Sequence, residues 1–348
     1  MKSSISGIIL VLTLAAGCSD DRPSMPTIPP DVAIGWQTQS SPLQDMVFLA
    51  VDFVDAHNGW IVGDSGTILV TANSGASWVI QESGTVDGLS SVDFVDANNG
   101  WVVGENGTIL HTDDGGESWT SQVSGTTVGL WDVDFVDTQE GWAVGYADRV
   151  PGVILHTTDG GKSWVDENNE PFPPPRKVLF SDNSHGWVLC GSKGVLSTTD
   201  GGESWVETSI ESVNAVLSLS FVDAEHGWAV SMSYEWVQGA GFNYADLHSV
   251  FHRTTDGGIT WSRMFEIPHA PGHLDLSFVD HDNGWAVGYG ADILHTADGG
   301  QTWSQQTSSI PNWFYLSSVV FIDSKIGWAV GDNGMILHTT TGGIEPEQ

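Results

Sequence analysis

The chain has 348 residues and a formal net charge of −34, because only 10 Lys and Arg stand against 44 Asp and Glu. A surface of this sign repels phosphate backbones and anionic bilayers, which argues against binding to nucleic acid or directly to a membrane surface. It suits a protein that is soluble outside the cell, and it leaves cations or basic partners as candidate ligands.

The N-terminal residues predict export. Residues 1–18 contain an apolar run at 8–16 that is too short for a stable membrane span, which is typical of a signal peptide. The run leads into the sequence LAAGC, which resembles the bacterial lipobox, in which the cysteine, here Cys18, becomes lipidated; Ala15 is a departure from that pattern. Ordinary signal-peptide cleavage nearby is the alternative. Residues 19–33 are polar and rich in proline, as expected of a flexible tether between a lipid anchor and a domain.

From residue 59 onwards a Gly-Trp pair occurs seven times, usually at a spacing of 41 residues. Its tryptophans are Trp60, Trp101, Trp142, Trp187, Trp228, Trp285 and Trp328. A repeat of about 40 to 50 residues that contains four short strands is the sequence pattern of a propeller blade. We therefore predict an all-β fold, a seven-bladed β-propeller of four-stranded blades, that occupies residues 34–343 as one domain and leaves 344–348 as a C-terminal tail.

The second repeat shows the order of the predicted elements. Residues 92–96 alternate apolar and polar side chains, as a half-buried strand does, and 101–103 form a second short strand after an Asn-Asn-Gly turn. The turn at 105–107 ends in glycine, which accepts a positive φ angle at no steric cost, and 108–112 form the third strand. The outer strand begins at Trp119.

The hairpin before this outer strand has the sequence TDDGGESW, which resembles the Asp-box, or bacterial neuraminidase repeat, of general form S/T-x-D-x-G-x-T/S-W. Its aspartate can accept hydrogen bonds from backbone amides of its own turn, and its glycines fold the hairpin. Five copies are intact, and another copy at 71–78 has Asn73 in place of the aspartate. We assign structural roles to the aspartates and tryptophans of the intact copies, which are Asp114, Asp159, Asp200, Asp256, Asp298, Trp119, Trp164, Trp205, Trp261 and Trp303.

The seventh hairpin, at 339–343, has neither the aspartate nor the tryptophan. The missing parts stand at the other end of the domain, where residues 34–40 read as an outer strand that contains Trp36. Trp36 precedes Phe53 by 17 residues, and at the other six junctions the Asp-box tryptophan precedes the next inner-strand phenylalanine by 16 to 18 residues. We therefore expect the N-terminal strand to complete the last blade and close the ring, which removes the sheet edges at which an open array would aggregate.

Irregular connection lengths concentrate on one predicted face of the ring, which we call the variable face. The Asp-box hairpins and the turns between first and second strands, which share the opposite face, hardly change in length. The variable face instead carries insertions at 146–152, 166–176, 231–249, 266–274 and 308–316. Insertions gathered on one face of a repeat protein often mark its binding face. The aromatic candidates for partner binding on this face are Tyr234, Trp236, Phe242, Tyr244, Trp313 and Tyr315.

Basic residues are also unevenly placed. Four of the nine that follow the signal region fall in hairpin turns of the third and fourth blades or in the link between these blades: Arg149, Arg176, Lys177 and Lys193. In one sector of the variable face they could anchor an acidic segment of a partner. Chance clustering is the alternative, since Arg and Lys favour exposed turns.

The sequence predicts no catalytic residue, cofactor or metal site. His111, His156, His295 and His338 occupy one repeat position in different blades, so they cannot converge on one zinc ion. The sequence DHDNG at 280–284 faintly resembles a calcium loop, but it aligns with the plain turns of the other blades. Repeated acids are positional copies and are interpreted as structural; they include Asp52, Asp93, Asp96 and Asp134.

The full repeat, FVDxxxGWxVGxxGxILHTxDGGxSW, as at 94–119 and 135–164, is similar to that of the photosystem II stability and assembly factor family of cyanobacteria and plastids. The resemblance extends over roughly residues 34–343. It implies a seven-bladed Asp-box propeller that acts as a non-enzymatic chaperone and binds newly made reaction-centre subunits at the membrane, with a lipid anchor in some members. A basic patch is associated with that role, and this chain has only the sparse cluster described above. Related propellers of non-photosynthetic bacteria are often secreted or lipoprotein surface modules, so the resemblance implies the fold more strongly than the partner.

We expect an exported, lipid-anchored, monomeric propeller, on the periplasmic side of a bacterial membrane or at the cell surface, that binds a membrane or surface protein as an assembly scaffold. The alternative is a carbohydrate-binding or glycoside-hydrolase-like surface propeller that stacks sugars on the aromatic residues of the variable face. A purely structural surface protein is a third possibility. Sialidases share the Asp-box but bind the substrate carboxylate with three arginines, and the few arginines here are scattered by strand and turn, which argues against that activity.

Overall fold

The computed structural model describes residues 35–147, 150–167, 173–191, 194–211, 213–238, 243–269, 272–308, 310 and 314–344. The predicted signal peptide, Cys18 and the tether lie outside these residues, as do the last four residues of the chain. Among the described residues, no helix has the length and apolar character needed to cross a membrane.

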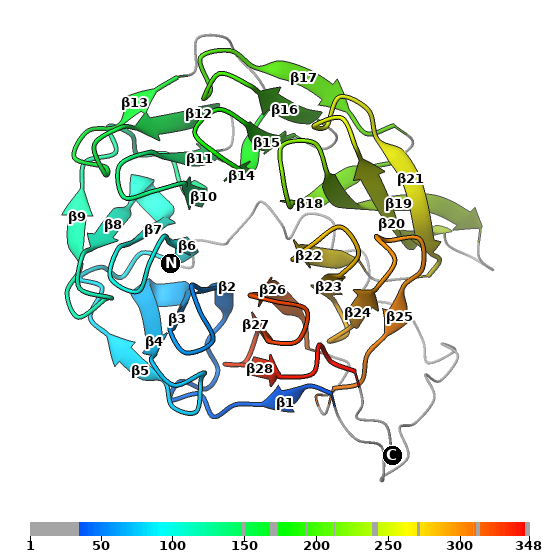
Figure 1. Ribbon diagram of the computed structural model, residues 1–348, viewed down its shortest axis with the longest axis horizontal. Helices are drawn as coiled ribbons and strands as arrows, with labels where there is room; N and C mark the ends of the chain where they lie inside the picture. Colours follow the sequence, from blue (N-terminus) through cyan, green and yellow to red (C-terminus); the bar gives the residue numbers. More distant parts are fainter. Residues whose placement is uncertain are drawn as a thin grey trace. The chain divides into compact units, whose positions relative to one another are not determined.

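The described chain forms seven four-stranded antiparallel sheets arranged in a ring (Figure 1). Blades 1 to 3 consist of β2 (Phe48–Phe53), β3 (Gly59–Gly63), β4 (Thr67–Thr71) and β5 (Val79–Gln81); β6 (Leu89–Phe94), β7 (Gly100–Gly104), β8 (Ile109–Thr112) and β9 (Thr120–Gln122); and β10 (Leu130–Phe135), β11 (Gly141–Ala147), β12 (Val150–Thr157) and β13 (Val165–Asp166). Two 3₁₀ turns, η2 (Asp64–Gly66) and η3 (Glu105–Gly107), join the second and third strands of blades 1 and 2.

The remaining blades follow the same order from the centre of the ring to its rim. Blades 4 to 6 consist of β14 (Pro175–Phe180), β15 (Gly186–Cys190), β16 (Gly194–Thr198) and β17 (Val206–Ser209); β18 (Ala215–Phe221), β19 (Gly227–Gln238), β20 (Asn243–Thr254) and β21 (Ser262–Ile267); and β22 (His273–Phe278), β23 (Gly284–Gly288), β24 (Ile293–Thr296) and β25 (Ser304–Gln305). Blade 7 combines β26 (Leu316–Phe321), β27 (Gly327–Gly331) and β28 (Ile336–Thr339) with β1 (Gln37–Thr38). The predicted seven-bladed, all-β propeller is confirmed.

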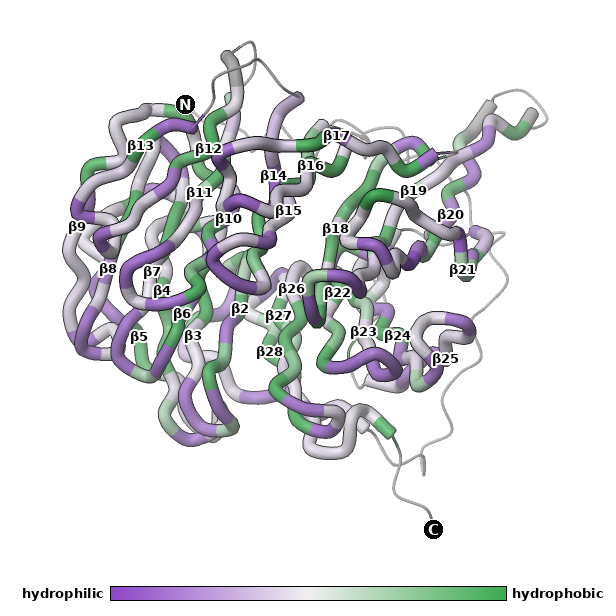
Figure 2. The backbone as a smooth tube through the Cα atoms, turned by 45° about the horizontal axis from the view of Figure 1, so that its top comes forward, coloured by the Kyte–Doolittle hydropathy of each residue, from purple (hydrophilic) through white to green (hydrophobic). Residues whose placement is uncertain are grey.

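Burial explains the sequence of each strand. The second strands, such as β3 and β7, are buried at every residue because neighbouring blades cover both of their faces. A strand covered on both faces is apolar without alternation, as GWIVG and GWVVG are. The outer strand β5 is largely exposed at the rim. Figure 2 shows the apolar stretches along the strands and the polar residues in the turns.

One aromatic contact recurs at all seven blade junctions. The tryptophan of each Gly-Trp pair stacks on the phenylalanine that ends the first strand of the next blade, with ring centroids 3.4 to 3.9 Å apart. The same phenylalanine meets the Asp-box tryptophan of its own blade edge to face, as Phe94 meets Trp119 at 5.9 Å. The stacked pairs are Trp60–Phe94, Trp101–Phe135, Trp142–Phe180, Trp187–Phe221, Trp228–Phe278, Trp285–Phe321 and Trp328–Phe53.

The glycine of the Gly-Trp pair is required by the same packing. A Cβ atom on Gly59 would overlap the ring of Phe53, which lies against it in the same blade, and the other six glycines of the pairs are similarly covered. The indole of Trp60 also donates a hydrogen bond of 2.9 Å to the carbonyl of Gly115 in the Asp-box of the next blade. Equivalent bonds form at five further junctions. Each of these junctions therefore combines ring stacking with a directed hydrogen bond.

The ring is closed by the N-terminal strand, as predicted. β1 pairs antiparallel with β28 and lies beside it at the rim (Figure 1). Trp36 is fully buried and meets Phe321 edge to face at 5.5 Å, the position that an Asp-box tryptophan holds in the other blades. Its indole donates to Gln306 at 2.7 Å, and Gln39 donates to the carbonyl of Ser74 in blade 1 at 2.7 Å. Residues 36–39 therefore connect blade 7 to both of its neighbours.

The substitution Trp36→Ala tests this closure. Because Trp36 is fully buried, we expect the free energy of unfolding to fall by about 3 to 5 kcal/mol, measured by urea and thermal denaturation. Trp236→Ala is the matched control, because Trp236 is 61% exposed and should tolerate truncation. Equal melting temperatures for the two variants would contradict closure by the N-terminal strand.

Candidate binding face and central channel

The largest insertion, at 231–249, forms a β-hairpin rather than a loop. β19 and β20 pair over their whole length of 12 residues each, and they extend beyond the neighbouring strands (Figure 1). Aromatic and β-branched residues favour extended pairing, which explains why the strands continue past the blade. Tyr234 and Trp236 share one face of β19 and lie edge to face at 6.1 Å. The hairpin thus presents the exposed Trp236 on a strand rather than on a loop.

The base of this hairpin is braced by paired acidic and histidine side chains. His248 on β20 lies 2.8 Å from Glu266 on β21. Asp246 lies 2.7 Å from His269 in the link to blade 6. The backbone N–H of Tyr234 donates to the side chain of Asn214 at 2.8 Å, which ties β19 to the link from blade 4. These contacts fix the direction of the hairpin relative to the ring.

Two further aromatic clusters lie on the variable face. Tyr315 packs on Tyr289 with ring centroids 5.8 Å apart, and burial is the main cause that raises the pKa of Tyr315 to about 12. Arg176 places its guanidinium 5.5 Å from the centroid of Tyr146, whose ring also lies 5.7 Å from that of Trp131. A cation beside an aromatic face is held there by the ring quadrupole. Arg176 and Tyr315 therefore have defined positions on this face.

Several predicted candidates lie outside the described residues, namely Arg149, Lys193, Phe242 and Trp313, together with the side chain of Tyr244. Arg176 and Lys177 correct the sequence prediction, which placed both in the link between blades 3 and 4. Both lie on the innermost strand β14, because that strand begins at Pro175. The ammonium of Lys177 lies 2.8 Å from Asp275 and donates to Ser218 at 3.0 Å, across the centre of the ring. Of the four basic residues predicted to form one sector, Arg176 is the one among the described residues that contacts a variable-face connection, through Tyr146, and it also lines the central channel.

The central channel encloses a cavity of about 440 Å³ lined by the first strand of every blade. One level of it is formed by residues that lie three positions before the stacked phenylalanines, namely Ala50, Ser91, Asp132, Lys177, Asp275 and Ser318. The residue at this position in blade 5, Ser218, is buried beside them. Burial alone would lower the pKa of Lys177, but Asp275 and Asp132 hold it above its ordinary value. Ser91 donates to Asp132 at 2.6 Å, and Ser218 donates to Asp275 at 2.8 Å. The ammonium of Lys177 thus interacts favourably with the carboxylates of Asp132 and Asp275, which come from different blades.

A second level of the channel carries three carboxylates directly before the phenylalanines of blades 1 to 3. Each accepts the backbone N–H of the next blade's phenylalanine at 2.8 Å, with Asp52 bonded to Phe94, Asp93 to Phe135 and Asp134 to Phe180. Burial raises the pKa of Asp52 to about 6 and that of Asp134 to about 7. Burial and repulsion by Asp134 and Asp52 raise the pKa of Asp93 well above its usual range. These acids tie adjacent blades together, which agrees with the structural interpretation.

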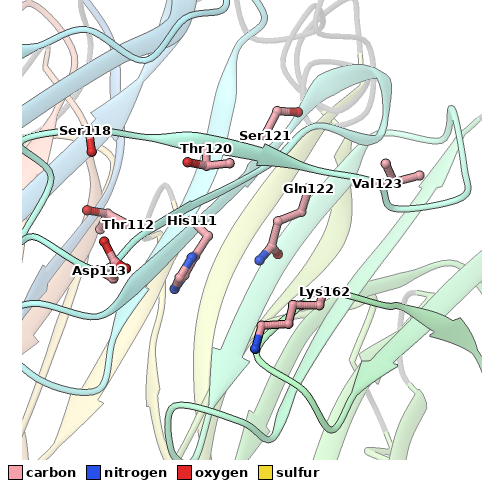
Figure 3. Close-up of a pocket in the computed structure, with 10 residues that line it drawn as sticks. His111, Thr112, Asp113, Ser118, Thr120, Ser121, Gln122, Val123 and Lys162 are labelled. Carbon is pink, nitrogen blue, oxygen red and sulfur yellow. The ribbon is translucent and has the colours of Figure 1, made fainter.

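A polar groove of about 400 Å³ lies between the outer hairpin of blade 2 and the Asp-box of blade 3 (Figure 3). His111, Asp113 and Gln122 contribute to it from blade 2, and Lys162 contributes from blade 3. Asp113 is the one carboxylate among the described residues that line it. Glycoside hydrolysis ordinarily needs two carboxyl groups that flank the scissile bond. The groove therefore gives no support to the glycoside-hydrolase alternative.

The protein is a seven-bladed Asp-box propeller with a polar central channel. The turns on its Asp-box face hardly vary in length, and its variable face carries a long hairpin with an exposed tryptophan. The family profile described as photosynthesis system II assembly factor YCF48 matches residues 29–121, 82–174 and 259–348, and the profile of the BNR/Asp-box repeat matches 252–263. The chain belongs to the YCF48 family of photosystem II assembly factor propellers.

Individual relatives agree with this assignment. A stretch of 42 residues is 45% identical to the photosystem II assembly protein Ycf48 of Thermosynechococcus vestitus, and it covers 12% of each of the two chains. The structure described as YCF48 bound to D1 peptide has a TM-score of 0.70 at 22% identity and covers 91% of this chain and 100% of that one. YCF48 from Cyanidioschyzon merolae has a TM-score of 0.68 at 19% identity and covers 88% and 98%.

A glycoside hydrolase, an ancestral GH74 enzyme, is also similar in fold. Its TM-score is 0.58 at 16% identity, and the alignment covers 88% of this chain but 45% of the enzyme. At such identity the likeness concerns the fold alone.

The channel carboxylates give a pH prediction. An acid whose pKa is higher in the folded than in the unfolded chain destabilises the fold as it ionises, so Asp134 should cost stability as the pH rises from about 4 to about 7. The amide oxygen of Asp134→Asn can still accept the N–H of Phe180. We expect this variant to be more stable than the parent above pH 7, by at most about 4 kcal/mol, and the difference to vanish near pH 4 in urea denaturation.

Asp96→Asn is a control for which we expect the opposite change in stability at neutral pH. The backbone N–H groups of Asn98 and Asn99 outweigh the effect of slight burial and lower the pKa of Asp96. Loss of this carboxylate should therefore destabilise the fold at neutral pH, and this destabilisation should diminish only as the pH falls below about 4, through the lowered pKa of Asp96. A stability difference for Asp134→Asn that does not change with pH would contradict the assignment.

Proposed function

We propose that this chain is a non-enzymatic assembly scaffold that holds a segment of a membrane protein on its variable face. The observation that carries this proposal is the hairpin of β19 and β20, which presents Trp236 at 61% exposure on a braced strand pair. A large exposed aromatic side chain on a rigid support loses little conformational entropy on binding, which is typical of binding hot spots. Family membership supports the same conclusion.

The class of partner is inferred by analogy with one of the solved structures reported above, which is described as YCF48 bound to D1 peptide. We propose that this chain likewise binds an extended peptide segment of a membrane-embedded subunit, and that the subunit belongs to a photosystem if the source is photosynthetic. Because Lys177 is paired with Asp275 in the channel, the described part of the face favours recognition by aromatic contacts, with Arg176 as a charged contact.

Anchoring at a membrane would place the propeller close to a partner in that membrane. With export and lipidation at Cys18, residues 19–33 would tether the domain to the membrane surface on the periplasmic side or at the cell surface. A flexible tether of 15 residues has a root-mean-square length of roughly 20 Å, which keeps the domain close to proteins of the same membrane. The chain carries a net charge of −34, which opposes direct contact of the domain with an anionic bilayer.

The double substitution Tyr234→Ser with Trp236→Ser tests the binding face. The full chain, expressed in its source and captured from detergent-solubilised membranes, should retain a specific membrane protein that the double variant retains at less than a tenth of the parent level. The matched control is Ile259→Ser, because Ile259 is 63% exposed on the Asp-box hairpin of the same blade, on the opposite face. Equal capture by all three chains, or recovery of glycans alone, would refute the proposal.

The substitution Cys18→Ala tests the anchor separately. We expect the protein to move from the membrane fraction to the soluble exported fraction, and to lose incorporation of radiolabelled palmitate, because the thiol that would carry the lipid is absent. Unchanged membrane fractionation and labelling would show that Cys18 is not the lipidation site.

A further inference from the structure

Each blade closes the turn between its first and second strands with an aspartate, and in blade 5 this residue is Asp223. Asp223 accepts the backbone N–H groups of Glu225 and His226 at 2.8 and 2.7 Å. The His226 Nδ1 atom also lies 3.0 Å from the carboxylate. In blades 1, 2 and 6 an asparagine makes this side-chain contact, and in blade 4 it is His185 with Asp182. His226 therefore follows a recurrent turn design.

His281 does not follow that design. It comes from the neighbouring turn of blade 6, and its Nε2 atom lies 2.9 Å from the second carboxylate oxygen of Asp223. The equivalent residues of the other blades are Ala56, Ala97, Thr138, Asn183, Ala224 and Ser324. Asn183 hydrogen-bonds to Asp137 of the preceding blade, so this position faces across the junction elsewhere in the ring as well. Neither the turn nor the blade contact requires an imidazole there.

The result is a cluster of three potential ligand atoms on the Asp-box face. The carboxylate of Asp223 and one nitrogen each of His226 and His281 all lie within 4.8 Å of one another. The His226 and His281 rings are 4.4 Å apart at an angle of 40°. Metal bonds of about 2.1 Å place neighbouring ligand atoms roughly 3.0 to 3.4 Å apart, close to the present nitrogen–oxygen distances. Small side-chain rotations would therefore bring all three atoms onto one ion.

We propose that Asp223, His226 and His281 bind a divalent transition-metal ion such as Zn²⁺. Two imidazoles and one carboxylate form a ligand set that suits Zn²⁺, Ni²⁺ or Cu²⁺ rather than Ca²⁺ or Mg²⁺. The side chains are partly open to solvent, with exposures of 42% for Asp223, 26% for His226 and 53% for His281, so water completes the coordination and the ion exchanges with the medium. The ion joins blade 5, which carries the long hairpin, to blade 6.

The test uses the full untagged chain and Zn²⁺ or Co²⁺ alone. Isothermal titration with Zn²⁺ and visible absorption with Co²⁺ should show a saturable site that raises the melting temperature. His281→Ala should weaken the affinity at least tenfold while the metal-free chain keeps a cooperative melting transition, since His281 is 53% exposed. His185→Ala is the matched control, because His185 contacts Asp182 in the same way but Ala224 stands where blade 6 has His281.

A gain-of-site variant completes the experiment. Ala224→His should supply the third ligand beside Asp182 and His185 and add a second saturable site. The proposal is supported if His281→Ala removes the parent site, His185→Ala keeps it and Ala224→His adds one. It is overturned if the parent shows no saturable binding of Zn²⁺ or Co²⁺, or if His281→Ala binds them as the parent does.

Discussion

The stack of one tryptophan on the phenylalanine of the next blade is the interaction on which the remaining structure depends. It recurs at seven junctions with centroid distances of 3.4 to 3.9 Å, and it dictates the glycine before each tryptophan because the phenylalanine of the same blade covers that Cα atom. Aromatic pairs add about 0.5 to 1.5 kcal/mol each beyond the burial of their area. A ring has no end at which such a contact can be omitted, so Trp36 comes from the N-terminal end of the domain to complete the aromatic cluster around Phe321.

This repeated packing separates the two faces of the propeller. Short turns on the Asp-box face sit directly against the stacked rings, since at six of the seven junctions a carbonyl of this hairpin accepts an indole N–H, such as that of Trp60. Connections on the other face are free of that constraint, and there blade 5 extends β19 and β20 to 12 residues each. The Asp-box face therefore stays constant while the variable face can change in length. Binding proteins commonly have this arrangement, in which loops or hairpins on a fixed scaffold contact the partner.

Features that repeat with the sequence period could be predicted, and features that depend on contacts between particular blades could not. The blade number, the Asp-boxes and the role of Trp36 follow from spacing alone. The partners of Lys177 did not follow, because Asp275 lies 98 residues away and meets it only through the geometry of the closed channel. His281 and Asp223 are 58 residues apart and meet across one junction for the same reason. The sequence did hold one clue, because a single repeat position of the inner strands carries unlike residues in different blades, among them Asp132, Lys177 and Asp275.

Site-specific photo-crosslinking in native membranes distinguishes the two faces of the propeller, because it reports which face meets a partner without removing any contact that holds the ring together. A benzophenone amino acid would be introduced in place of Trp236 on the variable face and, in a second chain, in place of Ile259 on the Asp-box face, both of which are more than half exposed. We expect a discrete adduct with a membrane protein from position 236 and none from position 259. Adducts from position 259 alone, or none from position 236, would show that the variable face is not the binding face.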